Sequence, residues 1–81
     1  MPKPNTALIY RRVPPFLRVM REKAGLTQRQ LASKIGQTQW WVARSETGSR
    51  RLDVAEFLEF CIGCGVDPGD ALADLRRHRS V

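Results

Sequence analysis

The segment LTQRQLASKIGQTQWWVARSETG, residues 26–48, decides the fold because it contains start and stop signals for two short helices. Thr27, with Gln30 three residues later, is a capping-box pattern, which predicts that a helix begins directly after Thr27. Gly36 is placed to end this helix, and Thr38 is a good N-cap for the next one. The segment therefore predicts two short helices joined by a tight turn.

The second predicted helix, from Gln39 to about Glu46, has two chemically different faces when successive residues are placed about 100° apart. The outer face carries Gln39, Trp40, Ala43 and Arg44, whereas the other carries Trp41, Val42 and Ser45. In the major groove, Gln pairs bidentately with adenine and Arg with guanine, and Ala leaves room for base edges. Two short helices of this kind form a helix-turn-helix arrangement, which predicts double-stranded DNA as the partner.

The positive charge of the chain is concentrated in its first two thirds. Residues 1–52 contain eleven Lys and Arg but two Glu, a net charge of +9, whereas residues 53–81 carry a net charge of −3. The whole chain carries +6. A cationic field confined to the part that holds the helix pair favours a polyanionic partner, and the alternative is an ordinary solvated surface.

Helix signals in the rest of the chain predict an all-α fold. One helix, over about 15–24, begins at a Pro-Pro pair, which is tolerated at a helix start. Another begins at the N-cap Asp53 and ends at Gly65, and the last begins at Asp67. With the two central helices, these predict a compact domain of five helices.

The predicted division of the chain has three parts. We expect a flexible basic N-terminal arm over residues 1–13, the helix-turn-helix domain over residues 14–77 and a C-terminal tail over residues 78–81. In the arm, the run Ala7–Tyr10 is apolar enough to pack on another part of the molecule, and Leu8–Tyr10 has the pattern of an extended piece.

The cysteines and the other titratable residues argue against an enzyme. Cys61 and Cys64 have a CxxC spacing, but they lie at a helix C-terminus, where the helix dipole opposes a thiolate, so we expect both in the core. A metal site would need two further ligands, and the one histidine, His78, lies in the predicted tail. The sequence offers no Ser/His/Asp set and no phosphate-binding glycine loop. We therefore predict no catalytic residues, no metal and no cofactor.

The run GLTQRQLASKIGQTQWWVARSETGSRRLDVAEFLEF, residues 25–60, resembles the phage-repressor and Cro-like (XRE-type) helix-turn-helix family. The residues that match in register are Leu26-Thr27-Gln28, Leu31-Ala32, Ile35-Gly36, Val42, Glu46 and Gly48. The resemblance covers about residues 16–72 and implies a lambda-repressor-like DNA-binding domain. It also implies a sequence-specific transcriptional regulator, expected to be a repressor, that binds a roughly palindromic operator as a homodimer.

The resemblance also implies roles for individual residues. Bases would be read by Gln39, Trp40, Ala43 and Arg44, and the DNA backbone would be contacted by Thr27, Gln28, Thr47, Arg50 and Arg51. Gln28 would in addition brace the groove contact. Arg21 and Glu46 match a structural ion pair between the first helix of the domain and the end of the 39–46 helix, and the alternative is two independent surface charges.

Three positions depart from the family pattern. Trp40 stands where a small polar residue is usual, so it suits stacking on sugar or a thymine methyl, or covering phosphate, better than direct base reading. Ser45 replaces a large apolar residue, and we hypothesise that Trp41 leans into the vacated space while the Ser45 hydroxyl bonds to the Trp41 carbonyl. Ile62 stands where a charged residue is usual.

The apolar residue at position 62 suggests a surface for association. Ile62, with Leu72 and Leu75 of the last helix, is a candidate for the dimer contact. The alternative is that the tail after residue 75 folds over it.

A second class of function stays open beside the regulator. It is an antitoxin-like or antirepressor-like module that binds a protein partner, with DNA binding as a secondary property. In either case we expect no small-molecule sensor domain, because only a tail follows the last predicted helix. We also expect no membrane partner, because no apolar run approaches the roughly 18 to 20 residues needed to span a bilayer. The expected location is the cytoplasm, with a bacterial or phage-encoded protein associated with the nucleoid.

Overall fold

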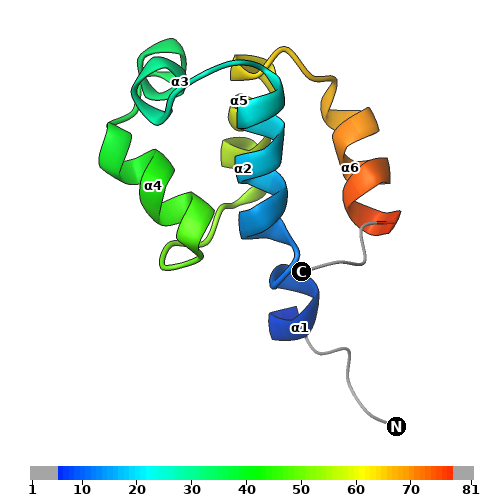
Figure 1. The fold of residues 1–81 in the computed structure, drawn as a ribbon. Coiled ribbons are helices and arrows are strands. Elements are labelled where there is room, and N and C mark those ends of the chain that lie inside the picture. The colour runs from blue at the N-terminus through cyan, green and yellow to red at the C-terminus, as the bar shows by residue number, and fades with distance from the viewer. Residues whose placement is uncertain (1–5, 78–81) are drawn as a thin grey trace, which may run out of the picture.

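The computed structural model describes residues 6–77, which form six helices and no strands. In chain order these are α1 (Thr6–Tyr10), α2 (Val13–Lys23), α3 (Gln28–Ile35), α4 (Gln39–Thr47), α5 (Val54–Gly63) and α6 (Pro68–Arg77). Figure 1 shows α3 and α4 on one side of the central α2 and α6 on the other, with α1 projecting beyond the rest. The all-α class and the five-helix domain are confirmed, the five helices being α2 to α6. None of the helices described is long and apolar enough to cross a membrane.

The helix-turn-helix unit is built by the local signals that predicted it. The Thr27 hydroxyl oxygen accepts the Gln30 backbone N–H at 3.1 Å, and the Gln30 side-chain oxygen accepts the Thr27 backbone N–H at 2.8 Å. Gly36 ends α3 with a φ of 69°, a left-handed conformation that glycine adopts without steric cost. The Thr38 hydroxyl then caps α4 by accepting the Trp41 N–H at 3.0 Å. Because both ends of the turn are hydrogen-bonded, α4 has a defined direction relative to α3.

The N-terminal segment differs from the prediction. The expected extended piece, Leu8–Tyr10, is wrong, because residues Thr6–Tyr10 form the short helix α1. A lone extended segment would need a neighbouring strand for its backbone, whereas this helix pairs its own groups, as in the bond from the Arg11 N–H to the Ala7 carbonyl at 3.1 Å. The first five residues of the predicted arm and the tail over residues 78–81 lie outside the described residues.

A tertiary hydrogen bond ties α1 to the body of the protein. The Tyr10 hydroxyl accepts the backbone N–H of Leu52 at 2.8 Å, in the loop between α4 and α5. The Arg51 guanidinium lies over the Tyr10 ring, 4.4 Å from its centre. Of the apolar run in the predicted arm, Tyr10 therefore packs on the domain, at the loop that follows α4, whereas Leu8 and Ile9 are exposed.

The core lies where α2, α3, α4 and α5 meet. Its fully buried large side chains are Leu17, Leu31, Val42, Phe60 and Cys61. Cys61 and Cys64 are both buried, as predicted, and burial raises the pKa of each thiol to about 11. Since the thiolate is the reactive form, both side chains behave as apolar core residues at neutral pH.

Gly63 allows α3 and α5 to approach closely. A Cβ atom at this position would lie 2.6 Å from Cγ2 of Ile35 and 2.7 Å from Cδ1 of Leu31. Alanine normally favours a helix over glycine by about 1 kcal/mol, but overpacking of a core contact costs about 1 to 3 kcal/mol. We therefore expect Gly63→Ala to lower the melting temperature measured by circular dichroism. Ser33→Ala on the exposed face of α3 is the control, for which no decrease is expected, and an unchanged melting temperature of Gly63→Ala would contradict the close contact.

Candidate nucleic-acid interface

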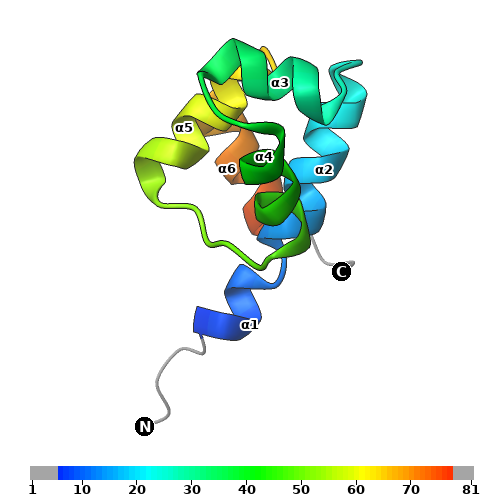
Figure 2. The same cartoon turned by 90° about the vertical axis from the view of Figure 1, so that its left-hand side faces the viewer.

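The four residues predicted to face bases lie along one side of α4. In Figure 2 this helix faces the viewer, with α3 above it and the loop to α5 below it. Gln39 is exposed and Trp40 is 68% exposed, whereas Ala43 and Arg44 are half-buried. The polar Gln39 and the small Ala43 leave room for base edges on this side, whereas the exposed Trp40 ring adds bulk beside them.

Arg44 is held in place by Trp40. Its guanidinium lies over the indole ring, 4.6 Å from the ring centre, which is a cation–π contact. Among residues 6–77 no carboxylate pairs with this guanidinium. Its charge and its hydrogen-bond donors therefore remain available to an external acceptor, while the indole restricts the positions that the side chain can take.

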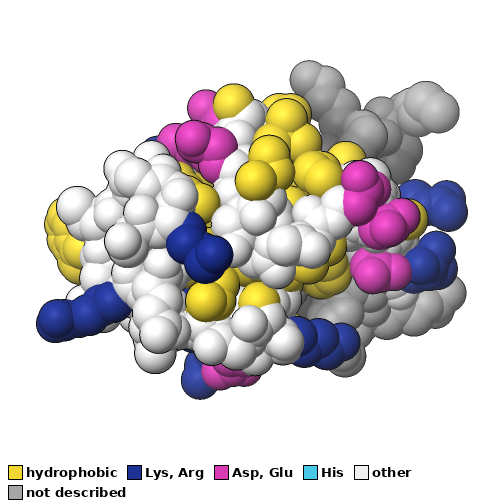
Figure 3. Space-filling model, turned by 90° about the horizontal axis from the view of Figure 1, so that it is seen from above, with side chains coloured by type: hydrophobic (Ala, Val, Ile, Leu, Met, Phe, Trp, Pro, Cys, Tyr) yellow, Lys and Arg dark blue, Asp and Glu magenta, His cyan; other side chains and the backbone are white. Residues whose placement is uncertain are grey.

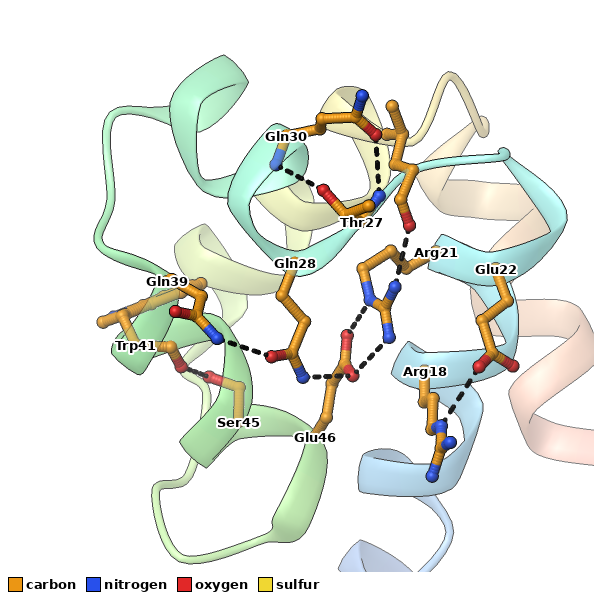
Figure 4. Close-up of polar contacts among 11 residues, drawn as sticks. Arg18, Arg21, Glu22, Thr27, Gln28, Gln30, Gln39, Trp41, Ser45 and Glu46 are labelled. Atoms are coloured by element: carbon orange, nitrogen blue, oxygen red, sulfur yellow. Dashed lines mark hydrogen bonds and ion pairs between the residues drawn. The ribbon is translucent and has the colours of Figure 1, made fainter.

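A chain of polar side chains links α2, α3 and α4 (Figure 4). Arg21 donates to both oxygens of Glu46, from Nε to Oε2 at 2.6 Å and from Nη2 to Oε1 at 3.0 Å. Gln28 donates from Nε2 to Glu46 Oε1 at 3.2 Å, and Gln39 donates from Nε2 to Gln28 Oε1 at 3.2 Å. The first residue of α4 is thus connected to a buried ion pair at the other end of the same helix.

The ion pair of this chain is shielded from solvent. The side chains of Arg21 and Glu46 are 10% and 3% exposed, and Arg21 also donates from Nη1 to the carbonyl of Leu26 at 2.7 Å. The hydrogen bond to Glu46 raises the pKa of Arg21 above its ordinary value. The two side chains form one buried ion pair, so the alternative of two independent surface charges is wrong for these residues.

The two arginines of the loop after α4 have different environments. Arg50 donates to both oxygens of Glu56, at 3.1 and 2.5 Å, and also lies over the Trp41 ring at 4.9 Å. The hydrogen bond between the two groups raises the pKa of Arg50 and lowers that of Glu56. Arg51 is exposed, and none of the described carboxylates pairs with it. Of the two side chains, Arg51 has the charge that is free to meet a phosphate.

The remaining predicted backbone contacts lie at the ends of α3 and α4. Thr27 is exposed at the N-terminus of α3, with its hydroxyl used in the capping box, and Gln28 is half-buried beside it. Thr47 is exposed at the C-terminus of α4 and donates its hydroxyl to the Arg44 carbonyl at 3.2 Å. Gln28 therefore lies beside α4, and Thr47 lies at the C-terminal end of that helix.

Residues 16–78 match the family model of a helix-turn-helix domain. An XRE-family like protein from Pseudomonas syringae pv. tomato str. DC3000 is 37% identical to the chain, with a TM-score of 0.76 over 89% of this chain and 92% of that one. The chain belongs to the XRE family. This is a family of helix-turn-helix DNA-binding transcriptional regulators, which confirms the resemblance seen in the sequence.

Two further solved structures share the fold of this XRE-family chain. A mutant of the restriction-modification controller protein C.Esp1396I is 21% identical, with a TM-score of 0.82 over 86% of this chain and 93% of that one. The clp gene regulator ClgR from C. glutamicum is 19% identical, with a TM-score of 0.78 over 98% of this chain and 99% of that one. No curated protein matches the chain.

Sequence reasoning about this XRE-family protein missed two residues that shape the interface. Tyr10 supports the loop that carries Arg51, and Glu56 pairs with Arg50. A signal for the first was that Tyr10 is the one tyrosine in the chain, within an apolar run. One hypothesised contact is present, since the buried Ser45 donates its hydroxyl to the Trp41 carbonyl at 2.8 Å.

The predicted dimer residues lie away from the exposed side of α4, on α5 and α6. Ile62 is 68% exposed, Leu72 is 52% exposed and Leu75 is half-buried. Val54 and Leu58 precede Ile62 at intervals of four residues, and both are exposed, so α5 carries an apolar stripe. Figure 3 shows hydrophobic side chains that reach the surface in a cluster, with acidic side chains on either side of it.

Proposed function

We propose that this chain is a sequence-specific regulator of transcription that binds double-stranded DNA as a homodimer and acts as a repressor. The observation that carries the proposal is the exposed side of α4, where Arg44 has no carboxylate partner among residues 6–77 and Gln39 is oriented by a hydrogen bond. Gln and Arg are the side chains that discriminate adenine and guanine in the major groove.

The proposed contacts divide into two groups. Bases are read from α4, with Trp40 as the platform for the guanidinium beside it, by Gln39, Trp40, Ala43 and Arg44. The DNA backbone is contacted from the ends of α3 and α4 and the following loop, by Thr27, Gln28, Thr47, Arg50 and Arg51. Within this second group we assign the larger electrostatic contribution to Arg51, because Glu56 already neutralises Arg50.

The apolar stripe supports the homodimer. Val54, Leu58 and Ile62 line the exposed side of α5, and Leu72 and Leu75 of α6 share an apolar groove with the first two. A two-fold contact through this surface would bring the α4 helices of the two protomers into successive major grooves, about 34 to 36 Å apart on a roughly palindromic operator. The regulator would then act in the cytoplasm, at the nucleoid of a bacterial or phage-infected cell.

The same stripe favours the second candidate function, an antitoxin-like or antirepressor-like module that binds a protein partner. An exposed apolar surface of this kind accepts a different protein as well as a second copy. Ile62→Asp separates the two candidates. Loss of cooperative operator binding supports the homodimer, whereas unchanged operator binding supports the alternative.

The function is tested by titrating the protein with random and genomic double-stranded DNA at two salt concentrations while following tryptophan fluorescence. Trp40 is exposed beside the proposed groove contact, so its emission should change when DNA binds. We expect affinity to fall as salt rises, because phosphate contacts release counterions. No change in fluorescence with any DNA at low salt would rule out the proposed function.

The salt dependence of DNA affinity can be compared between variants of Arg50 and Arg51, the two arginines of the loop after α4. Arg51→Ala is expected to reduce the slope of log affinity against log salt by about one unit, as expected for the loss of one phosphate contact. Arg50→Ala is the matched control, because it removes the same formal charge from a guanidinium that is already paired with Glu56. A larger change for Arg50→Ala than for Arg51→Ala would show that the assignment of the two residues is wrong.

A further inference from the structure

We propose that Glu46, which lies behind the interface, determines the base that Gln39 prefers by fixing the direction of the hydrogen bond between Gln28 and Gln39. The inference rests on the proposed function and adds a specificity-determining residue that does not contact DNA. Glu46 is buried, and its side chain faces Arg21 and Gln28. It is therefore a positioning residue, which acts through two side-chain amides.

The direction of the hydrogen bonds follows from the chemistry of the carboxylate. An ionised Glu can only accept hydrogen bonds, whereas the side chain of Gln has one accepting oxygen and a donating NH₂ group. Gln28 must therefore turn its NH₂ group to Glu46, and the distance from Nε2 to Oε1 is 3.2 Å. Its oxygen is left to face Gln39, which donates from Nε2 at 3.2 Å.

This direction determines what Gln39 can offer to a base. One of its two N–H groups is used by Gln28, so one N–H and the side-chain oxygen remain free. Adenine presents one acceptor and one donor in the major groove, which matches this pair of groups. Guanine presents two acceptors, N7 and O6, and would be matched by two N–H groups. Both N–H groups of Gln39 would be free only if the hydrogen bond to Gln28 ran in the opposite direction.

The ion pair holds the arrangement in place. Arg21 donates hydrogen bonds to both oxygens of Glu46, at 2.6 and 3.0 Å. The carboxylate therefore cannot rotate away from Gln28 without breaking one of these hydrogen bonds. If the amide of Gln28 were reversed, its oxygen would face a carboxylate oxygen at hydrogen-bond distance, and two acceptors would repel each other. The charge of Glu46 thus selects adenine over guanine at the base that Gln39 contacts.

The test is a selection of binding sites from random-sequence double-stranded DNA with the full chain. For the wild type we expect one position at which adenine is preferred over guanine by roughly 5- to 150-fold, and at which Gln39→Ala removes the preference. In Glu46→Gln the amide at position 46 can donate as well as accept, so both directions become available. The preference should then fall to about threefold or less.

Two further variants separate this effect from a loss of structure. Arg21→Met breaks the same ion pair and lets the carboxylate rotate, but it leaves Glu46 as an acceptor, so the preference for adenine should fall less than it does in Glu46→Gln. Gln28→Lys places a group at position 28 that can only donate, to Glu46 on one side and to the oxygen of Gln39 on the other. This variant keeps a partner for Glu46, and we expect its preference at the same position to turn toward guanine. Circular dichroism verifies that each variant is folded.

The outcomes distinguish the inference from the proposed function. If the wild type enriches no sequence, the proposed function fails and the inference fails with it. If the wild type enriches a motif but Glu46→Gln and Gln28→Lys retain its preference for adenine, the function stands and the inference is overturned. It is also overturned if Gln39→Ala changes no position of the motif, or if Arg21→Met relaxes the preference as much as Glu46→Gln does.

Discussion

Replacement of Arg21 with methionine is expected to lower the free energy of unfolding by about 3 to 5 kcal/mol, because it leaves the charge of Glu46 buried without its cationic partner. The Glu46 side chain is only 3% exposed, so solvent cannot replace the two lost hydrogen bonds. The carbonyl of Leu26 loses its side-chain donor in the same substitution. Small domains are stable by about 5 to 15 kcal/mol, so the variant should have a much lower urea midpoint at neutral pH.

Arg18→Met is the matched control for this measurement. Arg18 lies on the same helix and also pairs with a glutamate, Glu22 at 3.2 Å, but the two side chains are 65% and 52% exposed. Loss of an exposed pair changes stability by about 0 to 1 kcal/mol. Equal urea midpoints for the two variants would refute the buried-charge argument.

The second large effect is expected for Arg44→Ala, measured as the ratio of affinities for the selected site and for random DNA at one salt concentration. A bidentate contact between arginine and guanine contributes about 1 to 3 kcal/mol of discrimination against other bases. In the structure the guanidinium is placed over Trp40 before DNA is present, so little ordering of the side chain is needed on binding. The variant should therefore lose most of its preference at one base position.

The effect of removing the positive charge in Arg44→Ala must be distinguished from the effect of losing the base contact. Arg76→Ala removes one positive charge from α6, which lies on the opposite side of α2 from α4 (Figure 1). The variant should change the affinity for the selected site and the affinity for random DNA by the same factor. The ratio of the two affinities should therefore stay unchanged. If Arg44→Ala behaves in the same way as this control, Arg44 contacts the backbone and does not read a base.

The helix-turn-helix unit could be predicted from the sequence because its signals are local. The capping threonines, Thr27 and Thr38, and the glycine at position 36 act within four residues of the backbone groups that they satisfy. The short helix α1 has no such signal. Its position depends on the bond from Leu52 to Tyr10, which joins residues that are 42 positions apart in the chain. No pattern within the first thirteen residues encodes that contact.

The exposed side of α4 was predictable from helical periodicity, but the partners of its side chains were not. Arg50 and Glu56 are separated by a turn, so their contact depends on the path of the loop between α4 and α5. The pair of Arg21 and Glu46 was inferred from the family resemblance, because no spacing rule applies to residues 25 positions apart. The order of donors and acceptors from Arg21 to Gln39 depends on how α2, α3 and α4 pack against one another, which no local pattern indicates.

The bond between Tyr10 and Leu52 has an unequal effect on the mutational tolerance of the two positions. The donor is a backbone N–H, which every residue except proline supplies, whereas the acceptor is a single phenolic oxygen. Position 52 can therefore vary widely without loss of the bond, but at position 10 even phenylalanine removes it. Evolutionary constraint from this bond between α1 and the loop that follows α4 should thus fall on Tyr10 alone, in a part of the chain that lies before the matched helix-turn-helix domain.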